Sequence, residues 1–185
     1  MTNKMQRRAL YMPVLHIDAN LINARQKLET VNQLEKWADD GIICMNMSCT
    51  ARTEARTGKN LNRIRKADAQ IHTITPPAEA REPLYQEIEE AIFPDGAKNE
   101  NQQNDIKIII EAAKYAAILV TGDGGSKNQP GGMLGNRVKL KNILTILSPD
   151  EAVEFVRNKI EERDNFNKRV VDEIGGELPA WTGKD

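Results

Sequence analysis

Short apolar runs alternate with amphipathic segments along the chain, and this alternation constrains the fold more than any other feature. Apolar runs that predict buried strands lie at residues 14–17, 42–47, 118–121 and 143–147. Helical patterns lie at residues 20–40, 48–69, 83–93, 105–115 and 148–162. Strands without a polar face need cover on both sides, and strands that alternate with helices pair in parallel. We therefore predict an α/β fold, a three-layer α/β/α sandwich around a parallel sheet of four or five strands. Residues 71–75 are the candidate fifth strand or an extended link.

The length of 185 residues fits one domain with a short appendage. We expect the domain at residues 12–163 and a C-terminal extension at residues 164–185. No apolar run approaches the ~20 residues that span a bilayer, so no membrane association is expected. The apolar run at residues 9–17 is too short and too polar for a signal peptide, and two cysteines make no disulfide framework. We expect a reduced, cytoplasmic protein.

The charges nearly cancel, with 26 basic and 27 acidic residues and a formal net charge of −1. A strongly basic domain would have suggested nucleic-acid binding from bulk charge alone. If this chain handles nucleic acid, a local site must do so.

Two aspartates follow predicted strands. Asp18 comes directly after the first strand, and Asp123 lies two residues beyond residues 118–121. Ligands bind outside the carboxyl ends of the strands in open parallel sheets. An acid after a strand also serves as a helix N-cap, but two at separate strand ends favour a site.

Two helical acids can join them. Glu54 shares the buried face of its predicted helix with Ala51 and Leu61. Asp105 begins the helix predicted at residues 105–115, on the side that faces the core, and its alternative role is that of a helix cap. Four clustered carboxylates repel one another unless they are protonated or neutralised by a cation. Oxygen ligands suit Mg²⁺ or Mn²⁺, which activate water and stabilise the charge on a phosphate being cleaved.

These residues stand in segments that resemble the motifs of PIN-domain ribonucleases. Residues 17–22 resemble the opening motif, residues 48–55 the second, and residues 105–123 the combined third and fourth motifs. Residues 143–151 resemble the closing strand and helix.

The resemblance implies Mg²⁺- or Mn²⁺-dependent endonucleolytic cleavage of single-stranded RNA by a metal-activated water. By position, it implies that Asp18, Glu54, Asp105 and Asp123 hold the metal and act in catalysis, while Asn20 and Thr121 orient neighbouring groups. Many small members of the family are toxins with a partner antitoxin protein, and many form homodimers.

Two other functions remain open. One is a PIN fold that binds RNA or protein without cutting. The other is a haloacid-dehalogenase-like phosphatase, since residues 17–18 and 121–125 are similar to that family, although position 20 is asparagine rather than a second aspartate.

Two basic features flank the candidate site. The glycine-rich segment 122–135 is most simply a flexible loop, and the sharper hypothesis is that its amides and Lys127 follow an RNA backbone. Arg52, Arg56, Lys59, Arg63 and Lys66 form one stripe if residues 48–69 are a single helix. That stripe would lie nearly opposite Glu54 and face solvent, unless Gly58 breaks the helix.

Overall fold

Four parallel strands form the sheet at the centre of the molecule. A computed structural model of the chain describes residues 7–22, 25, 27–57, 60–69, 77–79, 82–125 and 130–185. The strands are β1 (Leu15–Ile17), β2 (Met45–Asn46), β3 (Ile118–Val120) and β4 (Thr145–Leu147), in the order β2-β1-β3-β4. The predicted parallel sheet is confirmed, with four strands in the described part of the chain. The candidate strand at residues 71–75 lies outside the described residues.

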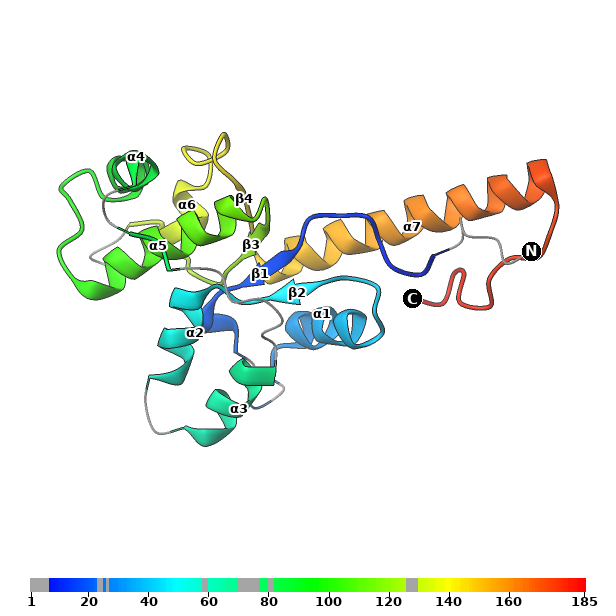
Figure 1. The fold of residues 1–185 in the computed structure, drawn as a ribbon, viewed down its shortest axis with the longest axis horizontal. Helices are drawn as coiled ribbons and strands as arrows, with labels where there is room; N and C mark the ends of the chain where they lie inside the picture. Colours follow the sequence, from blue (N-terminus) through cyan, green and yellow to red (C-terminus); the bar gives the residue numbers. More distant parts are fainter. Residues whose placement is uncertain are drawn as a thin grey trace.

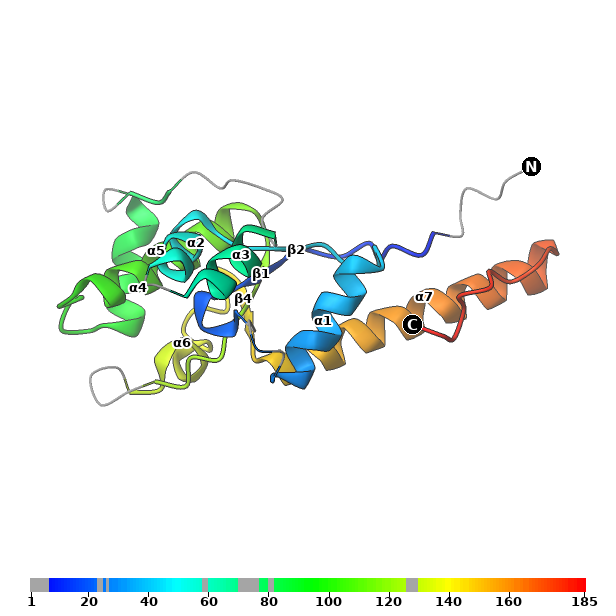
Figure 2. The same ribbon diagram turned by 90° about the horizontal axis from the view of Figure 1, so that it is seen from below.

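Helices cover both faces of this sheet (Figures 1 and 2). One face carries α1 (Glu29–Asp39) and α7 (Pro149–Ile174), which pack on Leu15, Ile17 and Val120. The other face carries α2 (Cys49–Arg56), α4 (Pro83–Ile92) and α5 (Glu100–Lys114), around a core that contains Leu119 and Ile146. Two further helices, α3 (Leu61–Ala69) and α6 (Gly132–Asn136), add to that second core. The three-layer α/β/α prediction is therefore correct.

Serine caps start two helices. Ser48 accepts a hydrogen bond from the Ala51 N–H at the start of α2, and Ser148 forms a capping box with Glu151 at the start of α7. These caps fix the point at which the chain turns back from β2 and β4 onto the faces of the sheet.

Three predicted helix boundaries are wrong. The helix expected from residue 20 is a 3₁₀ turn (Ala19–Leu21), in which Asn20 turns its side chain back to bond Asp18 and the Gly122 N–H. The helix α1 begins only at Glu29. The helix expected at residues 48–69 is split into α2 and α3, because Thr57 adopts an extended conformation at the end of α2. α5 begins at Glu100, capped by Asn99, so Asp105 lies inside the helix rather than at its cap.

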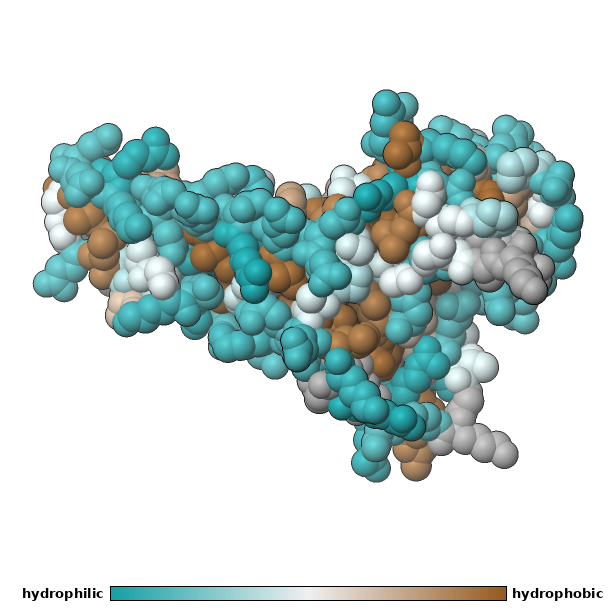
Figure 3. All heavy atoms as spheres, turned by 180° about the vertical axis from the view of Figure 1, so that it is seen from behind, coloured by the Kyte–Doolittle hydropathy of each residue, from teal (hydrophilic) through white to brown (hydrophobic). Residues whose placement is uncertain are grey.

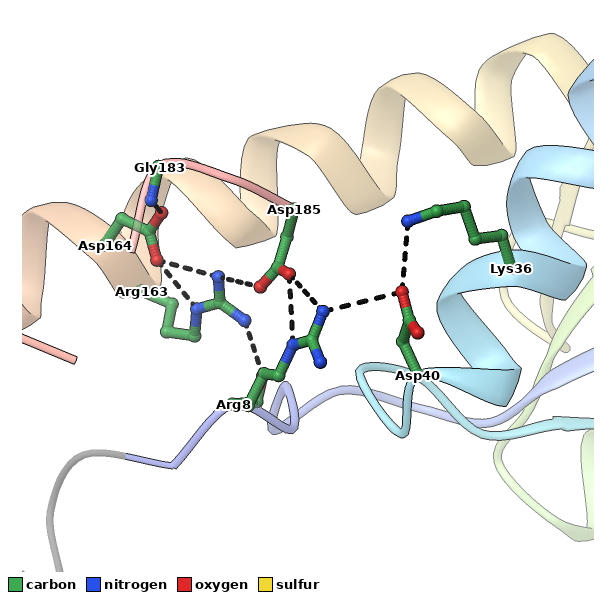
Figure 4. A network of polar contacts seen from close by, with 7 residues as sticks. All are labelled: Arg8, Lys36, Asp40, Arg163, Asp164, Gly183 and Asp185. Atoms are coloured by element: carbon green, nitrogen blue, oxygen red, sulfur yellow. Dashed lines mark hydrogen bonds and ion pairs between the residues drawn. The ribbon is translucent and has the colours of Figure 1, made fainter. Parts of the chain in front are cut away.

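The long helix α7 extends away from the body of the molecule (Figure 1). It runs to Ile174, so the boundary expected between residues 163 and 164 falls inside it. Arg163 and Arg8 both bond the Asp185 carboxylate, and Asp164 accepts the Gly183 N–H (Figure 4). The Arg163 guanidinium also stacks 4.4 Å from the centre of the Trp181 ring. This network ties the segments at both ends of the chain to one side of α7.

The surface is mostly hydrophilic when the molecule is viewed from behind, with apolar side chains visible along the extended part that contains α7 and along the body (Figure 3). Large exposed apolar side chains on or beyond α7 are Phe166, Ile174 and Leu178. Within the ranges described, the chain has no helix long and apolar enough to span a bilayer.

Candidate active site

Asp18 lies at the centre of the candidate site, directly after β1. Its side chain is 3% exposed, and its Oδ2 accepts hydrogen bonds from Thr121 Oγ1 at 2.6 Å and from Asn20 Nδ2 at 2.9 Å. The register pairs Ile17 with Val120, so the next residues, Asp18 and Thr121, meet at the carboxyl ends of β1 and β3. The chain leaves β1 toward β2 on one side and returns as β3 on the other. This is the switch point at which open parallel sheets bind ligands.

Asn20 and Thr121 hold this end of the sheet together. Asn20 Oδ1 accepts the Gly122 N–H at 3.1 Å, and Asn20 Nδ2 also reaches Thr121 Oγ1 at 3.2 Å. Thr121 Oγ1 in turn accepts the Asp123 N–H at 3.0 Å. The two residues thus contact Asp18 and the backbone beyond β3 at once.

Asp123 holds its own loop in place. Its Oδ1 accepts the Gly125 N–H at 3.0 Å, and its Oδ2 accepts the Met133 N–H at 2.8 Å. Gly132 has φ +54, and a Cβ at that position would lie 2.5 Å from Asp123 Oδ2. Glycine is therefore required where α6 meets the Asp123 carboxylate.

Glu54 and Asp105 approach from the helices of the second layer. Glu54 on α2 accepts a hydrogen bond from Asn104 Nδ2 at 2.9 Å, and Asp105 follows Asn104 on α5. Both acids are half-buried, and both line the same pocket as Asp18 and Asp123, with a volume of about 550 Å³. The fold therefore brings together four acids that the sequence separates by up to 105 positions.

The pocket concentrates negative charge around Asp18. Burial raises the pKa of Asp18 to about 6, and repulsion from the Glu54 and Asp123 carboxylates adds to the rise, while the Thr121 hydrogen bond opposes it. A bound cation would relieve this repulsion.

The donor chemistry of the pocket matches a hard divalent cation, because its acids offer only oxygen ligands. Among the residues that the structure describes, however, no three His, Cys, Asp or Glu side chains lie close enough to one another to hold a metal ion. Metal coordination by Asp18, Glu54, Asp105 and Asp123 therefore stays a prediction. Lys127, the candidate RNA contact, lies outside the described residues.

The expected basic stripe does not form. Arg52 and Arg56 on α2 both pair with Asp68, while Lys66 on α3 pairs with Glu35 at 2.7 Å. Lys59, the fifth member of the stripe, lies outside the described residues.

Arg63 instead turns into the acidic pocket, where its Nη2 donates to the Ala19 carbonyl oxygen at 2.9 Å. The break between α2 and α3 causes this difference, because it reorients everything after Thr57. The glycine at position 58 was the sequence feature that indicated a break in the predicted helix.

Glu111 is a second residue that the sequence interpretation missed. This fully buried carboxylate on α5 accepts hydrogen bonds from Thr50 N at 2.9 Å, Thr50 Oγ1 at 2.6 Å and Ala78 N at 3.0 Å. It anchors the first turn of α2, the helix that carries Glu54. An acid between Ile110 and Ala112, on an otherwise apolar helix segment, was the visible signal.

No protein-family model matches this chain, and no curated protein matches it significantly. The fold and the pocket define it as an α/β protein with an acidic pocket at the switch point of a parallel sheet.

Proposed function

We propose that this chain is a Mg²⁺- or Mn²⁺-dependent endoribonuclease that cleaves phosphodiester bonds of single-stranded RNA. The observation that carries the proposal is that Asp18, Glu54, Asp105 and Asp123 all line one pocket at the switch point of the sheet. The same four residues carry the resemblance to PIN-domain ribonucleases. Shared charge repulsion in the pocket supports a site that takes up a cation.

The four acids would hold the metal, which supplies an activated water and stabilises charge on the reacting phosphate. Thr121 and Asn20 fix the Asp18 carboxylate through hydrogen bonds to its Oδ2. Asn104 fixes the Glu54 carboxylate from the neighbouring helix. Because the pKa of Asp18 is about 6, this group is mostly ionised at neutral pH and available as a ligand.

The resemblance extends the proposal to a cytoplasmic toxin of a toxin–antitoxin pair that forms a homodimer and is held by an antitoxin protein. A small open reading frame beside the gene, whose product binds this chain, would support that subclass. Light scattering of the purified chain tests the homodimer.

A binding module that does not cut is the second candidate. It is favoured by the finding that, over the described ranges, no three potential ligands lie within reach of one ion. The phosphatase alternative gains no comparable support, because position 20 places an amide against Asp18 instead of a second carboxylate.

A cleavage assay separates these functions. Single-stranded RNA is incubated with the wild-type chain in Mn²⁺, in EDTA, and with the Asp18→Asn variant. The nuclease proposal predicts cleavage that EDTA and Asp18→Asn both abolish. Cleavage that survives both treatments rejects the metal mechanism, and RNA binding without cleavage supports the binding module.

A further inference from the structure

Arg63 is a cation in the wall of an otherwise acidic pocket. It extends from α3, and it is the sole basic residue among the described residues that line this pocket. We propose that Arg63 binds a phosphate group of the single-stranded RNA substrate, an inference that rests on the proposed function.

The guanidinium of Arg63 is held next to the candidate metal ligands. Its Nη2 donates to the carbonyl oxygen of Ala19, the residue that follows Asp18, at 2.9 Å. This bond uses only one of the five N–H groups that a guanidinium offers. The anchor fixes the position of the charge without neutralising it.

Three of the four other basic residues on α2 and α3 are paired with acids, and the fourth, Arg65, is exposed and lies outside the pocket lining. Arg52 and Arg56 share Asp68, and Lys66 pairs with Glu35. By contrast, Arg63 forms no ion pair with any residue that the structure describes, although five acids, Glu100 among them, line the same pocket. Its positive charge therefore remains available to an anionic ligand.

A phosphate is the ligand that this arrangement suits. The carboxylates of the pocket repel a phosphodiester, so the site needs fixed positive charge to admit one. A planar guanidinium binds two oxygens of a phosphate through parallel N–H groups, which orients as well as attracts it.

The alternative role of Arg63 is purely structural, because its bond to Ala19 also ties α3 to the turn after β1. Two variants separate these roles. Arg63→Gln removes the charge and leaves a shorter, neutral polar side chain, and Arg63→Lys keeps the charge but loses the planar fork. Arg56→Ala is the matched control, since Arg56 is exposed on α2 and bonds Asp68 outside the pocket.

The experiment measures equilibrium binding of a labelled single-stranded RNA in Mg²⁺, using the full chain with Asp18→Asn to block cleavage. Arg63→Ala and Arg63→Gln should each weaken binding by about 10- to 100-fold, which is the loss of a charged hydrogen-bonded contact. The slope of log binding constant against log salt concentration should become shallower by about one unit, as expected for the loss of one phosphate contact. Arg63→Lys should retain most of the affinity, and Arg56→Ala should change it by less than about threefold.

Kinetics in the otherwise wild-type chain give the second readout. Arg63→Gln should raise KM by a larger factor than it lowers kcat, whereas Arg63→Lys should leave KM nearly unchanged. Normal binding and KM in Arg63→Gln overturn the inference even if Arg63→Ala is impaired, since removal of a charge that contacts a phosphate must weaken RNA binding.

The two proposals fail separately. If the wild-type chain cleaves RNA and every Arg63 variant behaves like Arg56→Ala, only the role of Arg63 is rejected. If nothing is cleaved but Arg63→Gln still weakens RNA binding relative to Arg56→Ala, the nuclease is rejected and phosphate binding is upheld. No measurable RNA binding or cleavage by any variant rejects both.

Discussion

Thr121 donates its hydroxyl hydrogen to Asp18, with Oγ1 and Oδ2 2.6 Å apart. The bond joins the carboxyl ends of β3 and β1, and the same hydroxyl oxygen accepts the Asp123 N–H. One buried side chain therefore positions two of the five acids that line the pocket.

Thr121→Val should destabilise the chain by about 1–3 kcal/mol, because it leaves the buried Asp18 carboxylate and the Asp123 N–H without this partner. It should also raise the pKa of Asp18 further, since the lost hydrogen bond favours the ionised form. Urea unfolding checks the stability. Thr53→Val on the exposed side of α2 is the control, and equal losses in the two variants would contradict the assignment.

Asp18 should make stability depend on pH. Its pKa in the folded chain is about 6, above its ordinary value of 3.8, so the folded state favours the protonated form. The stability of the folded state is then greatest below about pH 4 and falls by about 3 kcal/mol as pH rises through 6. Asp18→Asn removes this loss, so the variant should be more stable than the wild type at pH 8 and nearly equal to it at pH 4.

Urea unfolding at several pH values between 4 and 8 measures this difference, with the exposed Asp95→Asn as the control. If Asp18→Asn is less stable than the wild type at pH 8, the fold does not disfavour the ionised form of Asp18, and the prediction is wrong.

Gly132→Ala should cost about 2–4 kcal/mol and abolish RNA cleavage. The new Cβ would meet Asp123 Oδ2 and Gly125 N at 2.5 Å, and φ +54 is unfavourable for alanine. Gly135→Ala in the same helix is the matched control, because nothing lies within 4 Å of its added Cβ. Thermal unfolding and a cleavage assay of both variants provide the comparison, and full activity in Gly132→Ala would argue against a role for Asp123.

Glu111→Gln should destabilise the chain by about 2–4 kcal/mol. All three hydrogen-bond partners of this carboxylate are donors, and the amide nitrogen of glutamine cannot accept from any of them. The exposed Glu154→Gln on α7 should cost little. A small loss in Glu111→Gln by urea unfolding would mean that the start of α2 does not depend on this anchor.

The parallel sheet and the strand-end acids were predictable from the sequence. Unalternating apolar strands require two covering layers, and the carboxyl ends of parallel strands share one edge, which brings Asp18 to Asp123. The serine caps at Ser48 and Ser148 were equally local signals.

The rest of the pocket depends on where the helices begin and end, which the spacing of apolar residues does not determine. The extended Thr57 ends α2, and this single break turns Arg63 from an expected solvent face into the pocket. Asn104 lies on α5 and meets Glu54 because α5 begins five residues before the predicted start at residue 105. The sequence gives no reason for an acid at Glu111 on an apolar helix face. The structure supplies the reason, because the backbone N–H groups of Thr50 and Ala78 donate hydrogen bonds to its carboxylate.

The central claim is that the acids around Asp18 hold one or more divalent cations. Anomalous diffraction from crystals grown with Mn²⁺ tests it most directly. The account predicts a manganese peak in the pocket that contacts Asp18 and is lost in crystals of Asp18→Asn. A fully occupied manganese site elsewhere in the crystal, with no peak beside Asp18, would contradict it.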